Sequence, residues 1–253
     1  MNELRNDLSD LTISVCMATF NGDRYIERQI ESILPQLKPG DELLVSDDGS
    51  TDSTLCVLKK FEKDLRLVNV FKVGGVVKNF EKVLSYSTNQ IIVLCDQDDV
   101  WLPGRLDKIR QKLASTDFLF MNGYVVNELL VDSGVDVLGY VGFRGGFVNT
   151  FLATKYVGCC LAFRRSILNV ALPFPRNIKW HDWYISLIAE LLYRCEVDVD
   201  KTILFRRHQS NASTTGSVSN SSFVEKAVDR FWIFLAVLSA LRRYVKLKIK
   251  GCF

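Results

Sequence analysis

The alternation of short apolar runs with helix-type patterns over the first half of the chain constrains the fold more than any other feature. Between the runs, hydrophobic residues recur three and four positions apart, as in amphipathic helices. Strands of almost continuous apolar character, separated by helices, are typical of a parallel sheet covered on both faces. The sequence therefore predicts an α/β fold with a Rossmann-like, mostly parallel central sheet flanked by helices. Its first five strands are expected at residues 13–18, 42–46, 65–71, 91–95 and 117–122.

Acidic residues directly follow two of these predicted strands. Asp47 and Asp48 come after the second run, and the fourth run, IIVLC, leads into Asp96, Asp98 and Asp99. In open parallel sheets, ligands bind beyond the carboxyl ends of the strands. We therefore expect these carboxylates to gather at one edge of the sheet and to form part of a binding site.

The aspartates of residues 96–99 repel one another if they are partly desolvated. A divalent cation relieves this repulsion, since Mg²⁺ or Mn²⁺ takes one or two carboxylates and keeps positions for water and substrate phosphates. The pattern also fits a solvated acidic turn, or the nucleophile strand of a haloacid dehalogenase-like phosphatase. The phosphatase motif ends the first strand of its fold, whereas three strand–helix units precede Asp96, and this order argues against it.

The second half of the chain is less regular. A glycine-rich stretch at residues 130–147 is expected to be extended. Strands are predicted at residues 158–165 and 201–208, and a helix at residues 180–194. Residues 209–222 form a polar loop of the kind that connects elements, and residues 223–250 have one long helical pattern.

Composition excludes several classes of protein. Of the 253 residues, 48% are hydrophobic and 24% are charged, which is typical of a globular protein and not of a disordered one. The net charge of +3 is too small to indicate nucleic-acid binding. Seven cysteines without Cys-x-x-Cys spacing predict reduced, buried thiols in a cytoplasmic protein. No secretory signal is expected in the polar first eleven residues, and no run reaches the ~18 apolar residues of a membrane span.

Three segments, taken in order and spacing, resemble the family 2 glycosyltransferases, which have the GT-A fold. They are ISVCMATFNGDRYIERQIESIL, LLVSDDGSTDST and IIVLCDQDDVWLPGRLDKI. Two later segments, WHDWY and FRRHQSN, are similar to those of a rhamnosyltransferase-like subgroup. The resemblance covers residues 12–211 and implies a catalytic domain at residues 1–221. Its nucleotide-sugar half would span residues 12–122 and its acceptor half residues 123–221.

The resemblance assigns the nucleotide to residues of the first half. It places Thr19 beside the nucleotide and implies that Asp48 binds the nucleobase or the ribose. Lys78 and Asn79 match a position near the nucleotide. Each has a simpler alternative: Thr19 as a turn residue, Asp48 as a helix cap, and the other two as polar surface of a helix.

The same resemblance implies a metal and diphosphate site. Asp98 matches the main metal ligand, and Asp96 the ribose or metal side, while Asp99 receives no role. Arg105 is expected either beside the diphosphate or as an ion-pair partner of these acids. His208 is a further candidate for the metal.

Asp182 matches the position of the catalytic base, which takes the proton of the acceptor hydroxyl; its alternative is a helix cap. Arg206 and Arg207 are expected to hold the diphosphate, or else to form a solvated basic turn. The subgroup implies an inverting, metal-dependent transfer of rhamnose from dTDP-rhamnose to a lipid-linked saccharide in bacterial O-antigen or capsule synthesis. A UDP-sugar donor is the alternative within the class, and a phosphatase or an inactive sugar-nucleotide-binding module are the alternatives outside it.

The segment at residues 222–253 is predicted to be a basic, amphipathic C-terminal helix. Its apolar part, residues 231–241, is too short to span a bilayer and is followed by RRYVKLKIK. This pattern fits a helix that lies on an anionic membrane, and the alternative is a helix packed on the catalytic domain. With a lipid-linked acceptor, we predict peripheral binding at the inner face of the cytoplasmic membrane.

Overall fold

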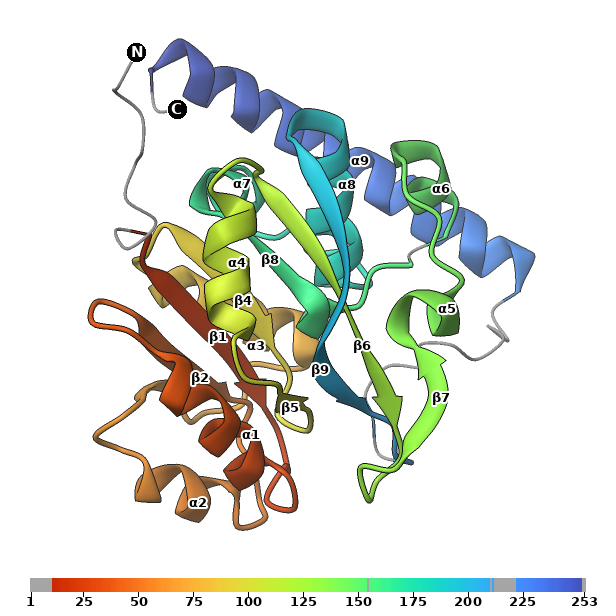
Figure 1. Cartoon of the computed structure of the whole chain (residues 1–253). Coiled ribbons are helices and arrows are strands. Elements are labelled where there is room, and N and C mark those ends of the chain that lie inside the picture. The colour runs from red at the N-terminus through yellow and green to blue at the C-terminus, as the bar shows by residue number, and fades with distance from the viewer. Residues whose placement is uncertain (1–10, 154, 210, 212–221, 252–253) are drawn as a thin grey trace, which may run out of the picture.

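The computed structural model describes residues 11–153, 155–209, 211 and 222–251, and one mixed sheet lies at its centre (Figure 1). Among the described residues the strand order is β3-β2-β1-β4-β8-β6-β9-β5, with β7 paired to β6. The strands are β1 (Ile13–Thr19), β2 (Glu42–Asp47), β3 (Arg66–Asn69), β4 (Ile91–Cys95), β5 (Val100–Trp101), β6 (Phe118–Val126), β7 (Asp132–Asp136), β8 (Leu161–Arg164) and β9 (Cys195–Arg206).

Most of these strands run in one direction. β1 is parallel to β2 and to β4, β2 is parallel to β3, and β6 is parallel to β9. β8 is antiparallel to both β4 and β6, so β6 returns to the direction of β4. The predicted α/β fold with a mostly parallel sheet is confirmed, and the carboxyl ends of β1, β2 and β4 meet at one edge.

Helices cover both faces of the sheet (Figure 1). α3 packs on β1 and β2, α4 packs on β6 and β8, and α9 contacts α7 and α8. The helices are α1 (Ile26–Ile33), α2 (Thr54–Lys60), α3 (Val76–Tyr86), α4 (Arg105–Leu113), α5 (Val137–Val141), α6 (Phe147–Leu152), α7 (Arg165–Ala171), α8 (His181–Leu192) and α9 (Phe223–Ile249), with 3-10 turns η2 (Leu34–Gln36) and η3 (Gly158–Cys160).

Position in the sheet explains how well each strand was predicted. All five residues of β4 are fully buried, because helices cover both faces of this inner strand, and such strands need continuous apolar runs. β3 is shorter than the predicted residues 65–71. It is an edge strand that pairs with β2, and two of its four residues are exposed.

The second half differs from the prediction in three places. Residues 130–147 are not extended throughout, because α5 and the start of α6 follow β7. Asp136 caps α5 by accepting a hydrogen bond from the N–H of Gly139, which fixes where that helix begins. The strand predicted at residues 158–165 begins as η3, and the one predicted at residues 201–208 begins earlier and ends at Arg206.

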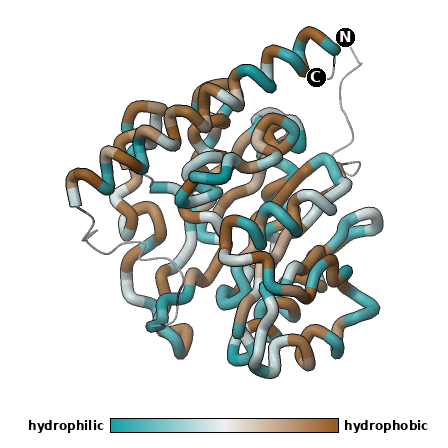
Figure 2. Tube along the Cα trace, turned by 180° about the vertical axis from the view of Figure 1, so that it is seen from behind, coloured by the Kyte–Doolittle hydropathy of each residue, from teal (hydrophilic) through white to brown (hydrophobic). Residues whose placement is uncertain are grey.

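The predicted long C-terminal helix is confirmed as α9. It begins with a capping box in which Ser222 and Glu225 each accept a hydrogen bond from the other's backbone N–H. One stripe of α9, formed by Ile233, Ala236, Val237 and Ala240, is buried, so the helix packs on the domain. Figure 2 shows hydrophobic and hydrophilic residues interspersed along it. Within the described part of the chain, no helix combines the length and the hydropathy needed to cross a bilayer.

The cysteines follow the predicted pattern in part. Those of the described residues are free thiols. Cys16, Cys95, Cys159 and Cys160 are buried, whereas Cys56 and Cys195 are exposed and Cys252 lies outside the described residues.

Candidate active site

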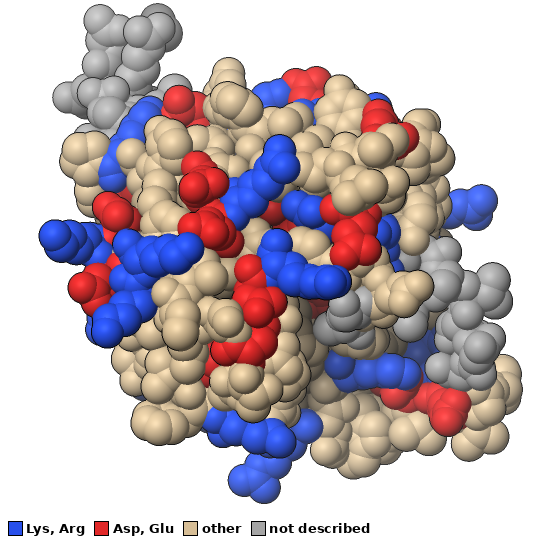
Figure 3. Space-filling model, turned by 90° about the horizontal axis from the view of Figure 1, so that it is seen from below, with Lys and Arg blue, Asp and Glu red and all other residues tan. Residues whose placement is uncertain are grey.

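A cavity of about 530 Å³ opens at the carboxyl ends of β1, β2 and β4. Segments that follow these strands form one wall, and η3, the start of α8 and the end of β9 form another. Figure 3 shows the molecule from this end, with acidic and basic side chains intermingled. Polar residues that line the cavity include Thr19, Asp48, Lys72, Asn79, Asp96, Asp98, His181, Asp182 and Arg207.

The loop after β4 directs its aspartates to different places. Asp96 and Asp98 line the cavity, as predicted from their position after the fourth strand. Asp99 instead is 1% exposed, and its Oδ1 accepts a hydrogen bond of 2.9 Å from the backbone N–H of Arg206. The acid that the sequence left without a role therefore ties this loop to the end of β9.

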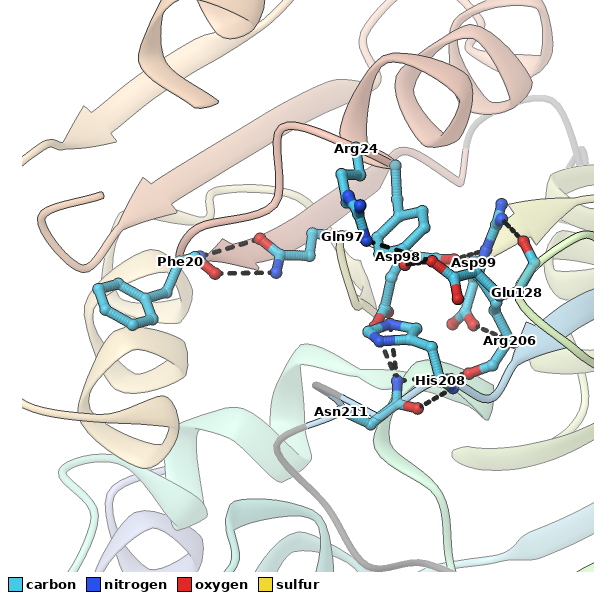
Figure 4. A network of polar contacts seen from close by, with 10 residues as sticks. Phe20, Arg24, Gln97, Asp98, Asp99, Glu128, Arg206, His208 and Asn211 are labelled. Carbon is cyan, nitrogen blue, oxygen red and sulfur yellow. Dashed lines mark hydrogen bonds and ion pairs between the residues drawn. The ribbon is translucent and has the colours of Figure 1, made fainter. Parts of the chain in front are cut away.

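Asp98 lies at the centre of a polar network (Figure 4). Its Oδ2 is 2.8 Å from Nε2 of His208 and 2.9 Å from Nδ2 of Asn211. The ring of Tyr25 packs against the imidazole, with ring centroids 4.6 Å apart. The carboxylate, the imidazole and the amide thus converge on one point, although 110 residues separate Asp98 from His208.

This pair has the geometry of two neighbouring ligands of one divalent cation. Octahedral Mg²⁺ binds its ligands at about 2.1 Å, so adjacent ligand atoms are roughly 3 Å apart. The 2.8 Å between Asp98 Oδ2 and His208 Nε2 fits that spacing. Carboxylate oxygens suit both Mg²⁺ and Mn²⁺, and Mn²⁺ also accepts an imidazole nitrogen as a ligand. Asp96 adds a second carboxylate from the same loop.

A second group of possible ligands lies deeper. Asp96, Asp99 and the thiol of Cys159 offer ligand atoms within 4.8 Å of one another. Among the described residues, Asp99 Oδ2 is buried without a hydrogen-bond partner. A thiol is a soft ligand that suits Mg²⁺ and Mn²⁺ poorly, and Asp99 does not line the cavity. Asp98, which lines the cavity and contacts His208, is therefore the better candidate ligand for a metal that also meets a substrate.

Crowding and burial shift the pKa values of the acids in the cavity. Burial, followed by repulsion from Asp98 and Asp182, raises the pKa of Asp96 to about 7. Burial, followed by repulsion from Asp98 and Asp96, also raises the pKa of Asp99. A bound cation would favour the ionised forms of both.

The cavity wall at the ends of β1 and β2 is built by hydrogen bonds between strand ends. Thr19 donates its hydroxyl to Asp47 at 2.8 Å. The amide of Asn79 accepts from Ser46 and donates to the backbone carbonyl of Thr19, at 2.6 and 3.0 Å. Both predicted residues therefore line the cavity, but their polar groups also hold β1, β2 and α3 together.

Asp48 organises the loop that precedes α3. Its carboxylate accepts hydrogen bonds from the backbone N–H groups of Val73, Gly74 and Gly75. Both glycines have φ near +100°, in the left-handed region that residues with a Cβ rarely adopt. Burial alone raises the pKa of Asp48, but these three donors outweigh it and hold the pKa below its ordinary value. The loop also brings Lys72, which the sequence did not single out, into the cavity wall.

The structure contradicts the prediction that Arg105 lies beside the diphosphate. The side chain is fully buried and does not line the cavity. Its guanidinium donates to Thr202 Oγ1 at 2.6 Å and to the carbonyl of Cys159 at 2.8 Å, and lies 5.0 Å from the ring of Trp101. In this position it holds β9 and η3 to α4 and cannot reach a diphosphate in the cavity.

The structure also contradicts the prediction that Arg206 holds the diphosphate. Arg206 is 5% exposed, and its guanidinium donates to the backbone carbonyls of Asp98 and Glu128, both at 2.6 Å. The neighbouring Arg207 does line the cavity. Lys78 lies on the exposed side of α3, outside the cavity wall, and its role stays a prediction. One predicted arginine of the pair therefore shapes the loop of Asp98, and the other lines the cavity.

The opposite wall of the cavity contains Asp182 in the first turn of α8. Its Oδ1 accepts from the N–H of Trp183 at 2.8 Å, and burial raises its pKa to about 6. His181 beside it stacks on Phe80 with ring centroids 4.1 Å apart. Trp180, His181 and Gly158 also line this wall. No role was predicted for them from the sequence, and their closeness to Asp182 along the chain or in space is the signal that marks them.

Solved structures with this fold are glycosyltransferases of the GT-A type. The structure of S. aureus TarS in complex with UDP-GlcNAc superposes with a TM-score of 0.65 at 20% identity, covering 93% of this chain and 73% of that one. A mannosyltransferase, PcManGT from Pyrobaculum calidifontis, solved with GDP-Man and Mn²⁺, gives a TM-score of 0.54 at 17% identity, covering 94% and 75%. These likenesses show the fold of the chain.

The chain belongs to glycosyl transferase family 2, whose family model matches residues 14–171. It is 29% identical over 215 residues to the dTDP-rhamnosyl transferase RfbG of Shigella flexneri, covering 77% of this chain and 72% of that protein. It is 26% identical over 186 residues to the UDP-Glc:alpha-D-GlcNAc-diphosphoundecaprenol beta-1,3-glucosyltransferase WfgD of Escherichia coli, covering 72% of each. The protein is therefore a glycosyltransferase.

Proposed function

We propose that this glycosyltransferase moves a sugar from a nucleotide-diphospho-sugar to an acceptor hydroxyl in one displacement, with inversion at the anomeric carbon. One observation carries the proposal. Asp98, which contacts His208 at 2.8 Å, and Asp182, a carboxylate with a raised pKa, line two walls of the same cavity. The first suits a diphosphate leaving group and the second an attacking hydroxyl.

The donor occupies the side of β1, β2 and β4. Thr19, Asp48 and Asn79 form the wall for the nucleoside, and Lys72 and Arg207 supply positive charge for the diphosphate. Asp98, Asp96 and His208 would hold Mg²⁺ or Mn²⁺. When bound, this ion neutralises charge that develops on the departing diphosphate, which is worth several kcal/mol. That PcManGT was solved with Mn²⁺ supports this assignment.

Asp182 acts as the general base. Its carboxylate takes the proton of the acceptor hydroxyl while the hydroxyl oxygen forms a bond to the anomeric carbon. The bond from that carbon to the diphosphate oxygen breaks, and the nucleoside diphosphate leaves with the electron pair. A positioned base of this kind contributes ~10²–10⁴-fold to the rate.

The donor that we propose is dTDP-rhamnose. Its support is the 29% identity to RfbG, together with the WHDWY and FRRHQSN segments. A UDP-sugar is the second candidate, because WfgD is named for a UDP-Glc substrate and TarS was solved with UDP-GlcNAc. A phosphatase is set aside, since the chain belongs to family 2.

The acceptor that we propose is a lipid-linked saccharide of bacterial surface-polysaccharide synthesis, such as O-antigen or capsule. WfgD, which is named for a diphosphoundecaprenol-linked acceptor, supports it. The exposed side of α9 supports docking on the inner face of the cytoplasmic membrane. It carries large apolar side chains, and its last third adds Arg242, Lys246 and Lys248, which attract anionic lipids. On this proposal residues 1–221 perform catalysis and residues 222–253 anchor them.

A screen of nucleotide-sugars tests the function. Purified protein is heated with dTDP-rhamnose, UDP-glucose, UDP-GlcNAc or GDP-mannose, each with and without Mn²⁺ or Mg²⁺. A ligand at 100-fold its dissociation constant should add ~2.7 kcal/mol of stability. We expect the largest stabilisation with dTDP-rhamnose and a metal. Stabilisation by another donor alone would reassign the sugar, and none with any donor would contradict the proposal.

A further inference from the structure

The loops that follow β1 and β4 lie on either side of a point where the strand order reverses. β1 lies between β2 and β4, and the chain forms β2 and β3 on one side of β1 before it crosses to β4 on the other. Open α/β sheets bind their ligands at such a reversal. The pairing of β1 with β4 ends at Met17 opposite Cys95. Beyond that pair, other contacts have to hold the two loops at a fixed distance.

The side-chain amide of Gln97 makes such a contact (Figure 4). Its Oε1 accepts a hydrogen bond of 2.9 Å from the backbone N–H of Phe20, and its Nε2 donates to the backbone carbonyl of the same residue at 3.0 Å. The amide thus pairs with Phe20 as a residue of a neighbouring antiparallel strand would. Gln97 stands between Asp96 and Asp98, and all four residues line the cavity. It therefore joins the loop of the candidate metal ligands to the loop after β1.

Gly22 leaves the room that this amide occupies. A Cβ at residue 22 would lie 2.2 Å from Gln97 Oε1, and the three atoms nearest to it all belong to the Gln97 amide. Gly22 is not among the glycines with positive φ, so its backbone conformation is open to residues that have a Cβ. The contact with Gln97 therefore accounts for the glycine, and a larger residue would displace the amide.

The loop after β1 is also bonded to the loop after β2. The backbone N–H groups of Asn21 and Gly22 donate to Ser50 Oγ and Thr54 Oγ1, each at 2.8 Å. Under the proposed function these two loops lie beside the nucleoside of the donor. They form one hydrogen-bonded unit, and Gln97 connects this unit to the loop of the candidate metal ligands.

We propose that Gln97 is a positioning residue that couples metal binding to nucleotide binding, because it holds the loop after β1 to the loop of Asp96 and Asp98. A metal that orders the two aspartates then also orders the nucleoside wall, through the two hydrogen bonds to Phe20. A bound nucleotide has the reverse effect on the metal, since such coupling is reciprocal. This inference rests on the proposed function, in which a nucleotide donor and a metal share the cavity.

Calorimetry with dTDP and with UDP tests the inference. The Kd of each nucleotide is measured with saturating Mn²⁺ and with EDTA, and the ratio of the two values is the coupling. Gln97→Ala removes both hydrogen bonds, and Gly22→Ala displaces the amide by a second route. We expect each variant to lower the coupling about tenfold, which is within the range of two hydrogen bonds. The Kd in EDTA should stay within about twofold.

The double variant and a second glutamine complete the design. Gln97→Ala/Gly22→Ala should match the single variants, because both substitutions break the same bonds. Gln36→Ala is the matched control. The amide of Gln36 also donates to a backbone carbonyl, that of Ser32 at 2.7 Å, and accepts from a backbone N–H, that of Leu106 at 3.5 Å, but it lies outside the cavity wall. This variant should lose stability in urea and keep the wild-type coupling.

Several outcomes would overturn the inference. One is an unchanged coupling in Gln97→Ala and Gly22→Ala, or a wild type whose nucleotide affinity does not depend on Mn²⁺. Another is an equal loss of affinity with Mn²⁺ and with EDTA, or an equal loss of coupling in Gln36→Ala, which would make Gln97 a structural residue. Additive losses in the double variant would show that the two substitutions act separately. If the wild type bound neither dTDP nor UDP with Mn²⁺, the proposed function would fail first and this inference with it.

Discussion

Asp98 Oδ2 lies 2.8 Å from Nε2 of His208, and this contact joins the loop after β4 to the segment after β9. Two further bonds secure it. Arg206 donates to the carbonyl of Asp98, and the backbone N–H of Arg206 donates to Asp99. The candidate metal site is therefore assembled from segments more than 100 residues apart, and each is held by backbone contacts that do not depend on an ion.

Removing either member of this pair should weaken metal binding. We expect Asp98→Asn and His208→Ala each to reduce Mn²⁺ affinity by at least about tenfold. Mutating a residue that only hydrogen-bonds a metal ligand already lowers metal affinity roughly 10–100-fold. The measurement is the Mn²⁺ concentration that gives half of the stabilisation by dTDP or UDP. Asp64→Asn, at an exposed acid after α2, is the matched control. Unchanged Mn²⁺ affinity in both variants would place the metal elsewhere.

The pH profile should report the ionisation of Asp182. Burial raises its pKa to about 6, and a general base works only as the carboxylate. Activity should therefore be full above pH 7 and fall as pH drops through about 6, tenfold per unit below it. Asp182→Asn should lose ~10²–10⁴-fold above pH 7 and should no longer show the fall in activity near pH 6. The measurement is kcat against pH from 5 to 8.

A helix acid outside the cavity provides the control for Asp182. Asp136 also accepts a backbone N–H at the start of a helix, but it lies at α5 and outside the cavity wall. Asp136→Asn should lower stability and leave the pH profile in place. If Asp182→Asn behaved in the same way, Asp182 would be only a helix residue and not the base.

The central strands and the loop acids could be predicted because their signal is local. An apolar run such as IIVLC needs two covering layers, and an acid that follows it must lie at the strand end. Asp96 and Asp98 were therefore placed correctly in the cavity. The antiparallel part of the sheet around β8 was not predicted. β8 inserts between β4 and β6 through long-range pairing that no local pattern encodes.

The two arginines at the end of β9 show where such prediction stops. Neighbouring residues of a strand point to opposite sides, so only one of Arg206 and Arg207 can face the cavity. Which one depends on register, and β9 shifts register twice against β6, near Met121 and Asn122. The second shift, after Asn122, is by one residue, and a one-residue shift reverses every later side chain. No local pattern predicts this shift, and the two arginines were therefore assigned the same role.

Arg105 should contribute to stability and not to nucleotide binding. Arg105→Met removes two buried hydrogen bonds and leaves Thr202 and the carbonyl of Cys159 without this donor. We expect a loss of roughly 3 kcal/mol in the free energy of unfolding, measured by urea denaturation. Affinity for dTDP or UDP with Mn²⁺ should not change. Lys78→Ala, at an exposed position, should stay within about 0.5 kcal/mol. Weaker nucleotide binding at unchanged stability would restore the diphosphate role of Arg105.

The exposed side of α9 carries a continuous apolar stripe. Val224, Val228, Phe231, Leu235 and Leu238 are spaced four, three, four and three positions apart, and each is at least 37% exposed. The stripe continues to Val245 and Ile249 past the basic residues of the last third. It lies on the side of the helix away from buried Ile233, Ala236, Val237 and Ala240. Packing on the domain and docking on a membrane can therefore use different faces of one helix.

Replacing two residues of this stripe should release the protein from anionic membranes. We expect Phe231→Ser/Leu235→Ser to lower binding to phosphatidylglycerol-containing vesicles about tenfold or more, because ~25 cal/mol is lost per Å² of apolar surface no longer buried. Flotation with the vesicles measures it, and binding should weaken in high salt, which screens the basic residues. Leu129→Ser is the control, because Leu129 is 82% exposed and does not belong to α9, and this variant should float like the wild type. Unchanged flotation of the double variant would sink the membrane proposal. A second outcome would also contradict the proposal: the wild type does not bind vesicles but forms dimers, and the double variant is monomeric. The stripe would then contact a second copy of the chain.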